Sequence, residues 1–217
     1  MYKKILPTLI FFIVFITNLS YAALLPNNAA VAVMDFGTHK GAATSDINLA
    51  HAEGASSDYI IERLVEDGRM TVMERSIMQE KLEAEKLKTT GIIDPDTAKR
   101  IGEILGVSYI IYGNVSDMTV SGTGTTAIVG GVNLLNVKCH IIARIMDVNT
   151  GDIITAAKGE GKSTSSLAAV GAPDVGVIAI GTHKVSQVSV HNALKKAAFN
   201  SMDIMLVRIY GEGKEKK

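Results

Sequence analysis

The sequence predicts an α/β domain whose mixed sheet is flanked by helices, in the order β-α-β-α-α-β-β-β-α. In the first half of the chain, short apolar runs alternate with helical patterns, which is typical of βαβ units with parallel strands. In the second half, apolar and polar residues alternate along runs separated by a turn signal, which indicates an antiparallel hairpin. The length left after a predicted leader, roughly 195 residues, suits one domain.

The first predicted unit is strand, helix, strand. The run AVAVMDF at residues 30–36 is typical of a buried strand, and a small polar loop at residues 37–54 follows it. Gly68 closes the next helix, at residues 56–66, because glycine adopts the left-handed conformation most easily. MTVM at residues 70–73 is the second strand. The apolar stripe of the helix consists of Tyr59, Ile60, Leu64 and Val65.

Two more helices follow before the chain returns to strands. Residues 74–87 are rich in strong helix formers, and residues 94–106 carry explicit helix ends. Asp94 suits the N-cap, Pro95 the first helical position and Gly106 the C-terminal end. The side chains of the first of these helices that we expect to face inward are Ile77, Met78 and Leu82.

The second half is predicted to contain strands at residues 107–115, 137–148 and 153–161, with the NTGD turn at residues 149–152 between the last two. A final helix covers residues 189–210. We expect one face of the middle strand to be buried: Val137, Cys139, Ile141, Ala143 and Ile145. We expect the final helix to pack on the sheet through Val190, Leu194, Ala197, Met205 and Leu206.

Residues 1–22 have the three parts of a secretory signal peptide. Two lysines precede an apolar run at residues 5–16, and small residues stand three before and one before a cut after Ala22. The alternative is a retained anchor, but the apolar run is shorter than the ~20 residues that a spanning helix needs. We therefore expect an exported chain with one domain at residues 23–210 and a disordered charged tail at residues 211–217.

Composition excludes several classes of function. The 22 basic residues balance the 22 acidic ones, so no basic excess points to nucleic acid. Cys139 is the single cysteine, which excludes an internal disulfide and any cysteine-cluster metal site. We expect it to face the core from a strand; an intermolecular disulfide is the alternative.

No catalytic constellation stands out. The five histidines do not follow metal-ligand helical spacing, although His39 and His51 share a polar loop where a metal site is an alternative. The segment GTGTTAIVGG is not a phosphate loop, because no Lys-Ser/Thr follows the glycines. SLAAVG lacks the Gly-x-Ser-x-Gly pattern of a nucleophile elbow. The sequence therefore predicts no enzyme, no cofactor and no metal.

Two segments, at residues 118–137 and 163–188, are nearly free of charge. Residues 118–137 contain no ionisable side chain, and residues 163–182 contain only Asp174. Each is long enough for two membrane β-strands of ~9–11 residues. Gly130-Gly131 would turn the first hairpin and residues 171–174 the second. The alternative is a pair of glycine-rich surface loops.

Alternation of apolar and polar residues is the proper test of a membrane strand, and it is partial here. From Val120 to Ile128 the even positions are the more apolar ones, so Ile128 would face lipid and Thr125 water. Alternation breaks at VNLLNV, residues 132–137, and at VIAI, which contains the candidate hairpin positions Val177 and Ile178.

The chain resembles the CsgG family, the curli-secretion channel proteins and their relatives. The resemblance rests on VAVMDF, GRMTVMERSIMQEKLEAEKL, GVSYIIYGNV and ARIMDVNTGDII, in that order, and covers residues 30–209. The Glu74-Arg75 helix start and the DVNTGDII hairpin are its most specific parts. It implies a periplasmic α/β domain and a ring-shaped homo-oligomer. In channel members, each subunit gives two β-hairpins to one shared outer-membrane barrel.

The sequence departs from the channel pattern in three ways, one of which is that the inserts look short and the region before the last helix is reduced. No cysteine follows the predicted cleavage site, whereas channel members carry a lipid anchor there. The family's pore constriction lies on the loop after the first strand and uses an aromatic residue and an Asn-Phe pair. Asn48 and Leu49 lie closest to that pair and are the candidate constriction residues, but this loop contains no aromatic residue.

Two functional hypotheses follow. The first is a CsgG-like outer-membrane secretion channel that exports protein subunits such as those of curli-type fibres. The alternative is a soluble periplasmic accessory protein, similar to LpoB, that binds another envelope protein and spans nothing. The implied partners are further copies of the chain, an exported protein substrate or envelope accessory proteins, and the outer membrane.

Overall fold

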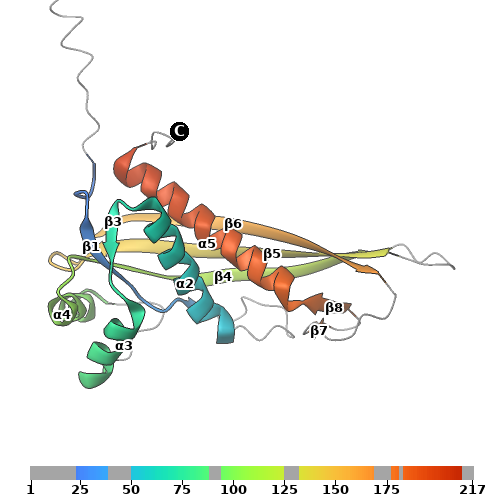
Figure 1. The fold of residues 1–217 in the computed structure, drawn as a ribbon, viewed down its shortest axis with the longest axis horizontal. Helices are drawn as coiled ribbons and strands as arrows, with labels where there is room; N and C mark the ends of the chain where they lie inside the picture. The colour runs from blue at the N-terminus through green and yellow to red at the C-terminus, as the bar shows by residue number, and fades with distance from the viewer. Residues whose placement is uncertain are drawn as a thin grey trace, which may run out of the picture.

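The computed structural model describes residues 23–38, 50–87, 94–124, 132–168, 177–180 and 183–211. A mixed sheet with the strand order β3-β1-β4-β5-β6 forms the middle layer (Figure 1). Helices lie on both faces of one end of this sheet, and three long strands run out beyond them. The predicted α/β class and the order of the nine predicted elements are confirmed.

The parallel part of the sheet is built around β1 (Ala29–Val33), the apolar run near the predicted mature N-terminus. It pairs in parallel with β3 (Met70–Val72) on one side and with β4 (Tyr109–Gly124) on the other. The predicted βαβ unit is therefore present. A two-residue strand that the sequence did not predict, β2 (Gly37–Thr38), also pairs in parallel with β4.

The antiparallel part is a meander of β4, β5 (Val132–Asp147) and β6 (Ile153–Ala168), each 16 residues long. We predicted that the first ends at residue 115, the second begins at residue 137 and the third ends at residue 161. All three boundaries were wrong. The prediction treated the loss of charge as the end of an element, but a β-ladder is held by backbone groups and continues regardless of side-chain charge.

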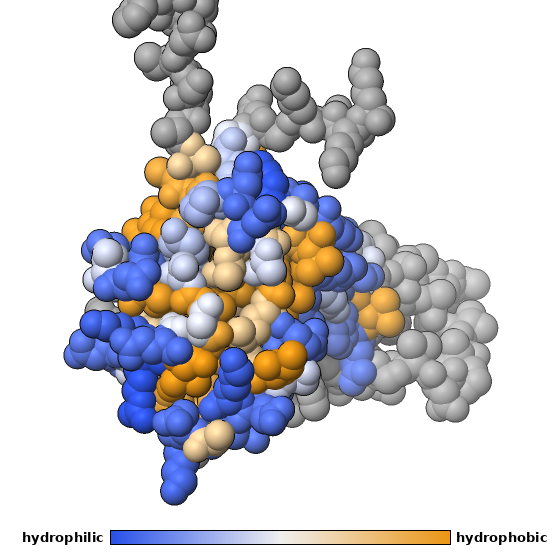
Figure 2. Space-filling view, turned by 60° about the vertical axis from the view of Figure 1, so that its left-hand side comes forward, coloured by the Kyte–Doolittle hydropathy of each residue, from blue (hydrophilic) through white to orange (hydrophobic). Residues whose placement is uncertain are grey.

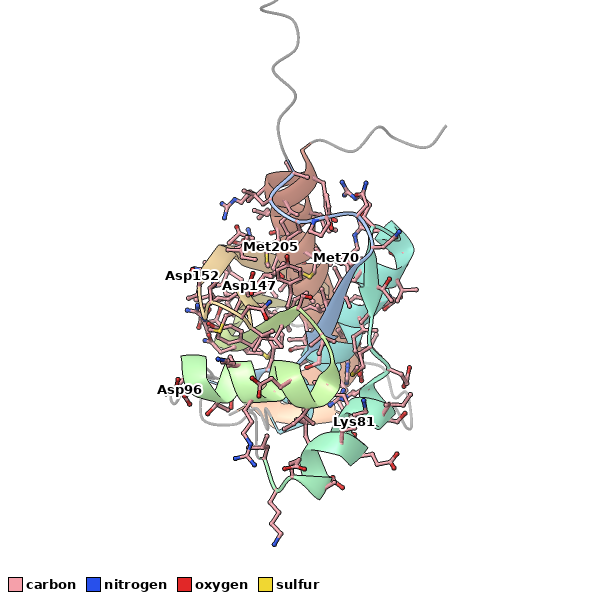
Figure 3. All side chains as sticks on the ribbon, turned by 90° about the vertical axis from the view of Figure 1, so that its left-hand side faces the viewer. Met70, Lys81, Asp96, Asp147, Asp152 and Met205 are labelled. Carbon is pink, nitrogen blue, oxygen red and sulfur yellow. The ribbon has the colours of Figure 1, made fainter. Side chains whose placement is uncertain are left out.

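Two helices cover one face of the sheet, α2 (Ala50–Asp67) and α5 (Gln187–Tyr210). They enclose the larger of two apolar clusters, which includes Met70 and Met205 (Figure 3). The predicted buried face of β5 belongs to this cluster, as do four of the five stripe residues of α5, with Val190 packed against them. The aliphatic stripes of strand and helix therefore meet as expected.

The opposite face is covered by α3 (Arg75–Ala84) and α4 (Pro95–Leu105), on which Lys81 and Asp96 are labelled in Figure 3. The ends of α4 are confirmed: the Asp94 side chain accepts a hydrogen bond from the Thr97 N–H at 3.0 Å, and Gly106 has a left-handed φ of 71°. The second apolar cluster consists of Ala32, Met34, Met78, Leu82, Ala98, Ile101, Leu105, Val107, Ile110, Tyr112, Met146 and Val148.

Some details of the helices differ from the prediction. Val65 and Ile77, both expected to face inward, are 63% and 49% exposed. Each lies next to a buried residue, Leu64 or Met78, and a helical step of 100° separates neighbours in sequence. Helix α2 begins at Ala50, so His51 lies in a helix and not in the loop where a metal site was considered.

The second uncharged segment does not form the hairpin that we predicted. Its first residues extend β6, and a separate two-stranded sheet pairs β7 (Val177–Ile180) with β8 (His183–Ser186). The pairing of this small sheet runs from Val177↔Ser186 to Ile180↔His183, whereas the predicted turn at residues 171–174 lies outside the described residues. The VIAI run that broke the alternation is β7 itself.

Helix α5 lies unusually close to β6 because two glycines of β6 face it. A Cβ atom on Gly159 would collide with the backbone of Ala197 and Ser201, and one on Gly161 with the backbone of Ala193 and Ala197. Only a strand position without a side chain allows a helix backbone to approach so closely. The GEG sequence of β6 thus fixes where α5 sits.

Cys139 is fully buried on the helix-covered face of β5, as predicted. Burial raises the pKa of its thiol to about 12, with a smaller contribution from Asp117. Because the thiolate is the reactive form, we expect the folded protein at pH 8 to react with a disulfide reagent at least about a hundredfold more slowly than a free thiol. Urea should restore the normal rate. A fast reaction in the absence of denaturant would show that the thiol is accessible.

Candidate functional site

The three long strands continue beyond the helices as a ribbon that we call the distal ribbon, defined as residues 118–124, 132–137 and 163–168. Its backbone pairing is continuous, from Met118↔Cys139 to Gly124↔Asn133 and from Val137↔Ser163 to Val132↔Ala168. In Figure 1 it projects away from the α/β body. None of its residues is ionisable. The described parts of the first uncharged segment, residues 118–124 and 132–137, are therefore extensions of core strands.

Side chains at the base of the distal ribbon alternate between its two faces. Met118 and Val137 are buried on the face that α5 covers, and Val120 packs against the same cluster. Thr119 and Ser121 are exposed. This alternation agrees with the phase predicted from the sequence, in which the even positions of this strand are the apolar ones.

Charged residues end at the base of the ribbon, on the face opposite α5. Asp117, His140 and Glu160 form one row across β4, β5 and β6. The His140 ring lies between the two carboxylates: its Nδ1 is 3.3 Å from Asp117 Oδ2, and its Nε2 is 3.2 Å from Glu160 Oε2. Because the carboxylates contact opposite ring nitrogens, they cannot share one metal ion with the ring. Among the described residues no group of three or more His, Cys, Asp or Glu side chains could hold a metal.

The next row outward carries two lysines, Lys138 and Lys162, and both pair with Glu160. The Nζ of Lys162 is 2.8 Å and that of Lys138 3.4 Å from a carboxylate oxygen. One row further, charge is replaced by a neutral hydrogen bond, in which Thr164 Oγ1 donates to Asn136 Oδ1 at 2.7 Å. The charged rows thus mark a sharp boundary between a polar body and an uncharged ribbon.

The charged rows make stability depend on pH. Hydrogen bonds from Lys162 and then His140 hold the pKa of Glu160 at about 2, below its ordinary value of 4.5. Ionised Glu160 therefore stabilises the fold above pH 4.5, and this contribution is lost as the pH falls towards 2. We expect Glu160→Gln to flatten the decrease in the urea midpoint over this range, and Lys162→Met to do so in part. Parallel curves for the wild type and Glu160→Gln would contradict this assignment.

A second polar cluster joins two of the sequence motifs. Arg75, at the start of α3, donates from Nη2 to Asp35 Oδ1 at 2.5 Å. Its Nη1 donates to Asp58 Oδ1 at 2.5 Å and to the Gly54 carbonyl oxygen at 3.0 Å. The conspicuous Glu-Arg at residues 74–75 therefore connects the end of β1, α2 and α3. Sequence reasoning found both motifs but not this pairing, since nothing in the spacing of Asp35 and Arg75 signals contact.

Ser57 strengthens the same junction from α2. Its hydroxyl donates to the Met34 carbonyl oxygen at 3.0 Å and accepts from the Phe36 N–H at 3.2 Å. Both flanks of Asp35 are therefore fixed to the helix. The chemistry of this junction is structural, because it anchors the start and the end of the segment that was predicted as a constriction loop.

The predicted site residues fall largely outside the described part of the chain. Asn48 and Leu49 do so, and so do the hairpin positions Thr125, Ile128, Gly130 and Gly131. Val177 and Ile178 lie in β7, paired with Ser186 and Val185 of β8. The structure therefore places only the last two, in a sheet separate from the distal ribbon.

Elsewhere on the described surface, apolar and charged side chains are mixed and do not gather into a site. Figure 2 shows apolar and charged side chains interspersed on the end of the body opposite the ribbon. Large exposed apolar residues in the described part of the chain are scattered over several elements: Leu24, Val65, Ile77, Ile153, Val188 and Val207. No helix among the described residues is long and apolar enough to cross a bilayer.

Comparison with protein families identifies the chain. The model of the CsgG family, described as curli production assembly/transport component CsgG, matches residues 18–214. The chain belongs to the CsgG family. The resemblance drawn from its motifs is confirmed, and the Asp35–Arg75 contact joins two of the CsgG-like blocks. No curated protein sequence gives a significant match.

Several solved structures are similar to this CsgG family chain. The LpoB C-terminal domain from Salmonella enterica has a TM-score of 0.45 and 14% identity, covering 67% of this chain and 90% of its own. Lipoprotein GNA1162 from Neisseria meningitidis has a TM-score of 0.41 and 15% identity, covering 63% and 84%. The PelC dodecamer from Paraburkholderia phytofirmans has a TM-score of 0.39 and 10% identity, covering 88% and 95%.

Proposed function

We propose that this chain is a subunit of an oligomeric outer-membrane secretion channel of the CsgG type. In this proposal the distal ribbon of each copy enters the bilayer and contributes strands to one shared barrel. Exported protein subunits, such as those of curli-type fibres, are the proposed cargo. The observation that carries the proposal is the distal ribbon itself: three hydrogen-bonded strands without ionisable residues that leave the body at a sharp charge boundary.

Membrane physics supports this use of the ribbon. A strand needs ~9–11 residues to cross the hydrocarbon core, and 20 residues from 118 to 137 carry no ionisable side chain. The charged rows of Glu160, Lys138 and Lys162 would then lie at the water boundary, where their cost is small.

The open edges of the ribbon require several copies. Within the described residues, β2 pairs with β4 as far as Val115, and no strand pairs with the outer edge of β4 beyond that point. The outer edge of β6 is also free of a strand partner. Open sheet edges are not tolerated in lipid, so a single copy cannot span the membrane. Closure into a ring would pair both edges.

A second candidate function is the periplasmic accessory protein, and one observation favours it. Strands β7 and β8 are four residues long in the described part of the chain, which is well short of a membrane strand. In this case the chain would bind another envelope protein through its body.

Fractionation separates the two candidates. The full chain is expressed with its leader, and the membranes are washed with carbonate before extraction in mild detergent. The channel predicts that the protein stays in washed membranes and is extracted as a ring of several copies. A monomer recovered entirely from the detergent-free periplasmic fraction would support the accessory protein and contradict the channel.

A further inference from the structure

The outer edge of β6 has no strand partner in the described residues, so another chain could add a strand to it. An unpaired strand edge presents backbone N–H and C=O groups that can pair with another chain. In an antiparallel sheet both backbone groups of a residue point to the same side. On β6, the residues that point away from β5 are therefore the alternate ones that include Ala156, Glu160 and Lys162, as their contacts with α5 show.

Side chains of α5 bind three of these outward groups within the body. Lys196 Nζ donates to the Lys162 carbonyl oxygen at 3.1 Å. Asn200 Oδ1 accepts from the Glu160 N–H at 3.0 Å. Arg208 Nη1 donates to the carbonyl oxygen of Ala156.

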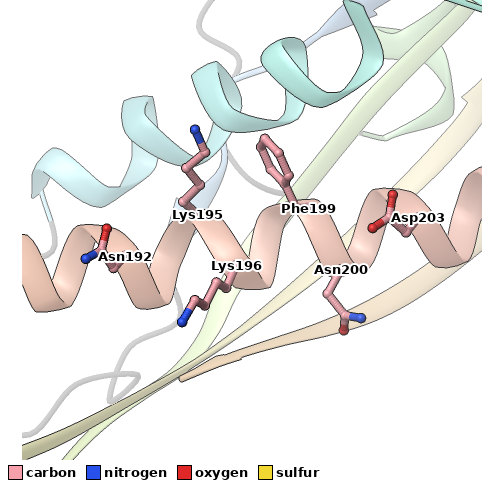
Figure 4. A pocket seen from close by; sticks show the side chains of 6 residues that line it. All are labelled: Asn192, Lys195, Lys196, Phe199, Asn200 and Asp203. Carbon is pink, nitrogen blue, oxygen red and sulfur yellow. The ribbon is translucent and has the colours of Figure 1, made fainter. Parts of the chain in front are cut away.

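The three side chains follow a row that winds around the helix. Lys196 and Asn200 are four positions apart and share one side of α5, and Arg208 lies eight positions further on, about 80° around the helix from Asn200. Figure 4 shows Lys196 and Asn200 pointing to the strand beneath the helix, while Lys195 points to α2. Lys195 instead pairs with Glu62 of α2 at 2.7 Å. One side of α5 thus contacts β6, and the neighbouring side contacts α2.

Protection of the two edges ends at nearby levels of the sheet, because Val115 pairs with Ile141 of β5 and Lys162 pairs with Lys138 of β5. On β6 the last capped group belongs to Lys162. On β4 the pairing with β2 ends at Val115, and a register shift follows between Val115 and Asp117. The two ends lie on either side of the row of Asp117, His140 and Glu160, and the distal ribbon lies beyond Lys162. A β-bulge is a known device for ending pairing at an edge.

We infer that α5 protects the edge of β6 from strand addition, and thereby limits pairing between copies of this chain to the distal ribbon. The partner concerned is a second copy of the chain, whose own edge would otherwise add to β6 between Ala156 and Lys162. The inference rests on the proposed function for its second half. Three side chains of α5 would then determine where copies of the chain can pair, because they bind backbone groups of β6 that a second copy would otherwise bind. They are Lys196, Asn200 and Arg208.

The test removes the three caps and looks for pairing at the exposed edge. The variant Lys196→Ala, Asn200→Ala, Arg208→Ala keeps good helix formers in α5. Lys158→Cys, at an exposed position of β6 inside the capped stretch, reports contact between two copies through disulfide formation. The native Cys139 is buried and does not interfere. We expect the cross-linked dimer of the full chain to rise at least about fivefold over Lys158→Cys alone, with larger species in sedimentation.

The matched control is Asn192→Ala, Lys195→Ala, Asp203→Ala, which removes polar groups of α5 that form no hydrogen bond or ion pair with β6 in the described residues. It should leave the cross-link unchanged. Charge cannot explain the expected rise, because the triple variant loses two positive charges from a mature chain with 20 basic and 22 acidic residues, which opposes self-association.

Equal cross-linking in the capped and uncapped proteins would overturn the inference, and so would larger species without the cross-link. If circular dichroism shows that the triple variant is unfolded, Asn200→Ala alone replaces it, and an unchanged yield in that variant decides against the inference. If the wild-type chain is found only in the periplasmic fraction, the channel proposal is wrong. The cross-linking result still tests the protection of β6, because it compares two variants in the same fraction.

Discussion

Replacement of Gly161 by valine is expected to destabilise the fold by at least about 3 kcal/mol, or to prevent folding. A Cβ atom at this position would meet the Ala193 carbonyl oxygen and would lie 2.5 Å from the Ala197 nitrogen. Both obstacles are helix backbone, which cannot rotate away as a side chain can. Overpacking typically costs ~1–3 kcal/mol and more where the surroundings are rigid. Total stabilities are only ~5–15 kcal/mol.

The control for this change is Lys162→Val, at the next residue of the same strand. The Lys162 side chain is 69% exposed, and valine is favoured in strands. We expect a change within about 1 kcal/mol, mostly from the lost ion pair with Glu160. Urea denaturation of both variants measures the difference. If Gly161→Val unfolds at the same urea concentration as Lys162→Val, α5 does not lie against β6 as described.

Leu82→Ala is expected to lower the free energy of unfolding by about 2–5 kcal/mol, as truncations of buried leucine do. Leu82 is 4% exposed and belongs to the apolar cluster under α3 and α4. The cost has two parts, the lost burial of the side chain and the cavity left between helix and sheet.

Ile77→Ala provides the matched control on the same helix. The sequence pattern placed Ile77 in the core, but its side chain is 49% exposed. We expect a loss within about 0.5 kcal/mol, as for other exposed positions. Thermal or urea denaturation that gave a loss above 2 kcal/mol for Ile77→Ala and below 0.5 kcal/mol for Leu82→Ala would mean that α3 presents the wrong face.

The parts of the fold that could be predicted are those determined by local chemistry. Asp94, Pro95 and Gly106 act through backbone rules that hold in any context, and the alternation of Cys139 and its neighbours reflects the two-residue period of a strand. The failures share one cause. The limits of a buried helix face, as at Val65 and Ile77, depend on which other elements pack against the helix. The length of a strand depends in the same way on its neighbours. A single segment of sequence does not contain that information.

The candidate site was predictable only as a segment. The absence of charge at residues 118–137 indicated the distal ribbon. The sequence analysis, however, predicted this segment as an insert between two strands, whereas its described parts continue β4 and β5. The caps on β6 could not be predicted, because Lys196, Asn200 and Arg208 look like ordinary exposed positions of a helix. Their contacts join residues that are 34 to 52 positions apart in the chain. The contact between Asp35 and Arg75, which are 40 positions apart, could not be predicted for the same reason.

The central claim is that the distal ribbon enters a bilayer, and the most direct test compares Ile128→Arg with Thr125→Arg. Both positions lie outside the described residues, and the alternation of the sequence from Val120 to Ile128 predicts that Ile128 faces lipid and Thr125 water. Arginine on the lipid side costs up to ~2–4 kcal/mol at the bilayer midplane. The measurement is the yield of membrane-extracted oligomer. We predict a strong loss for Ile128→Arg and a near-wild-type yield for Thr125→Arg. Equal, near-wild-type yields, with the protein in the periplasmic fraction, would contradict the channel.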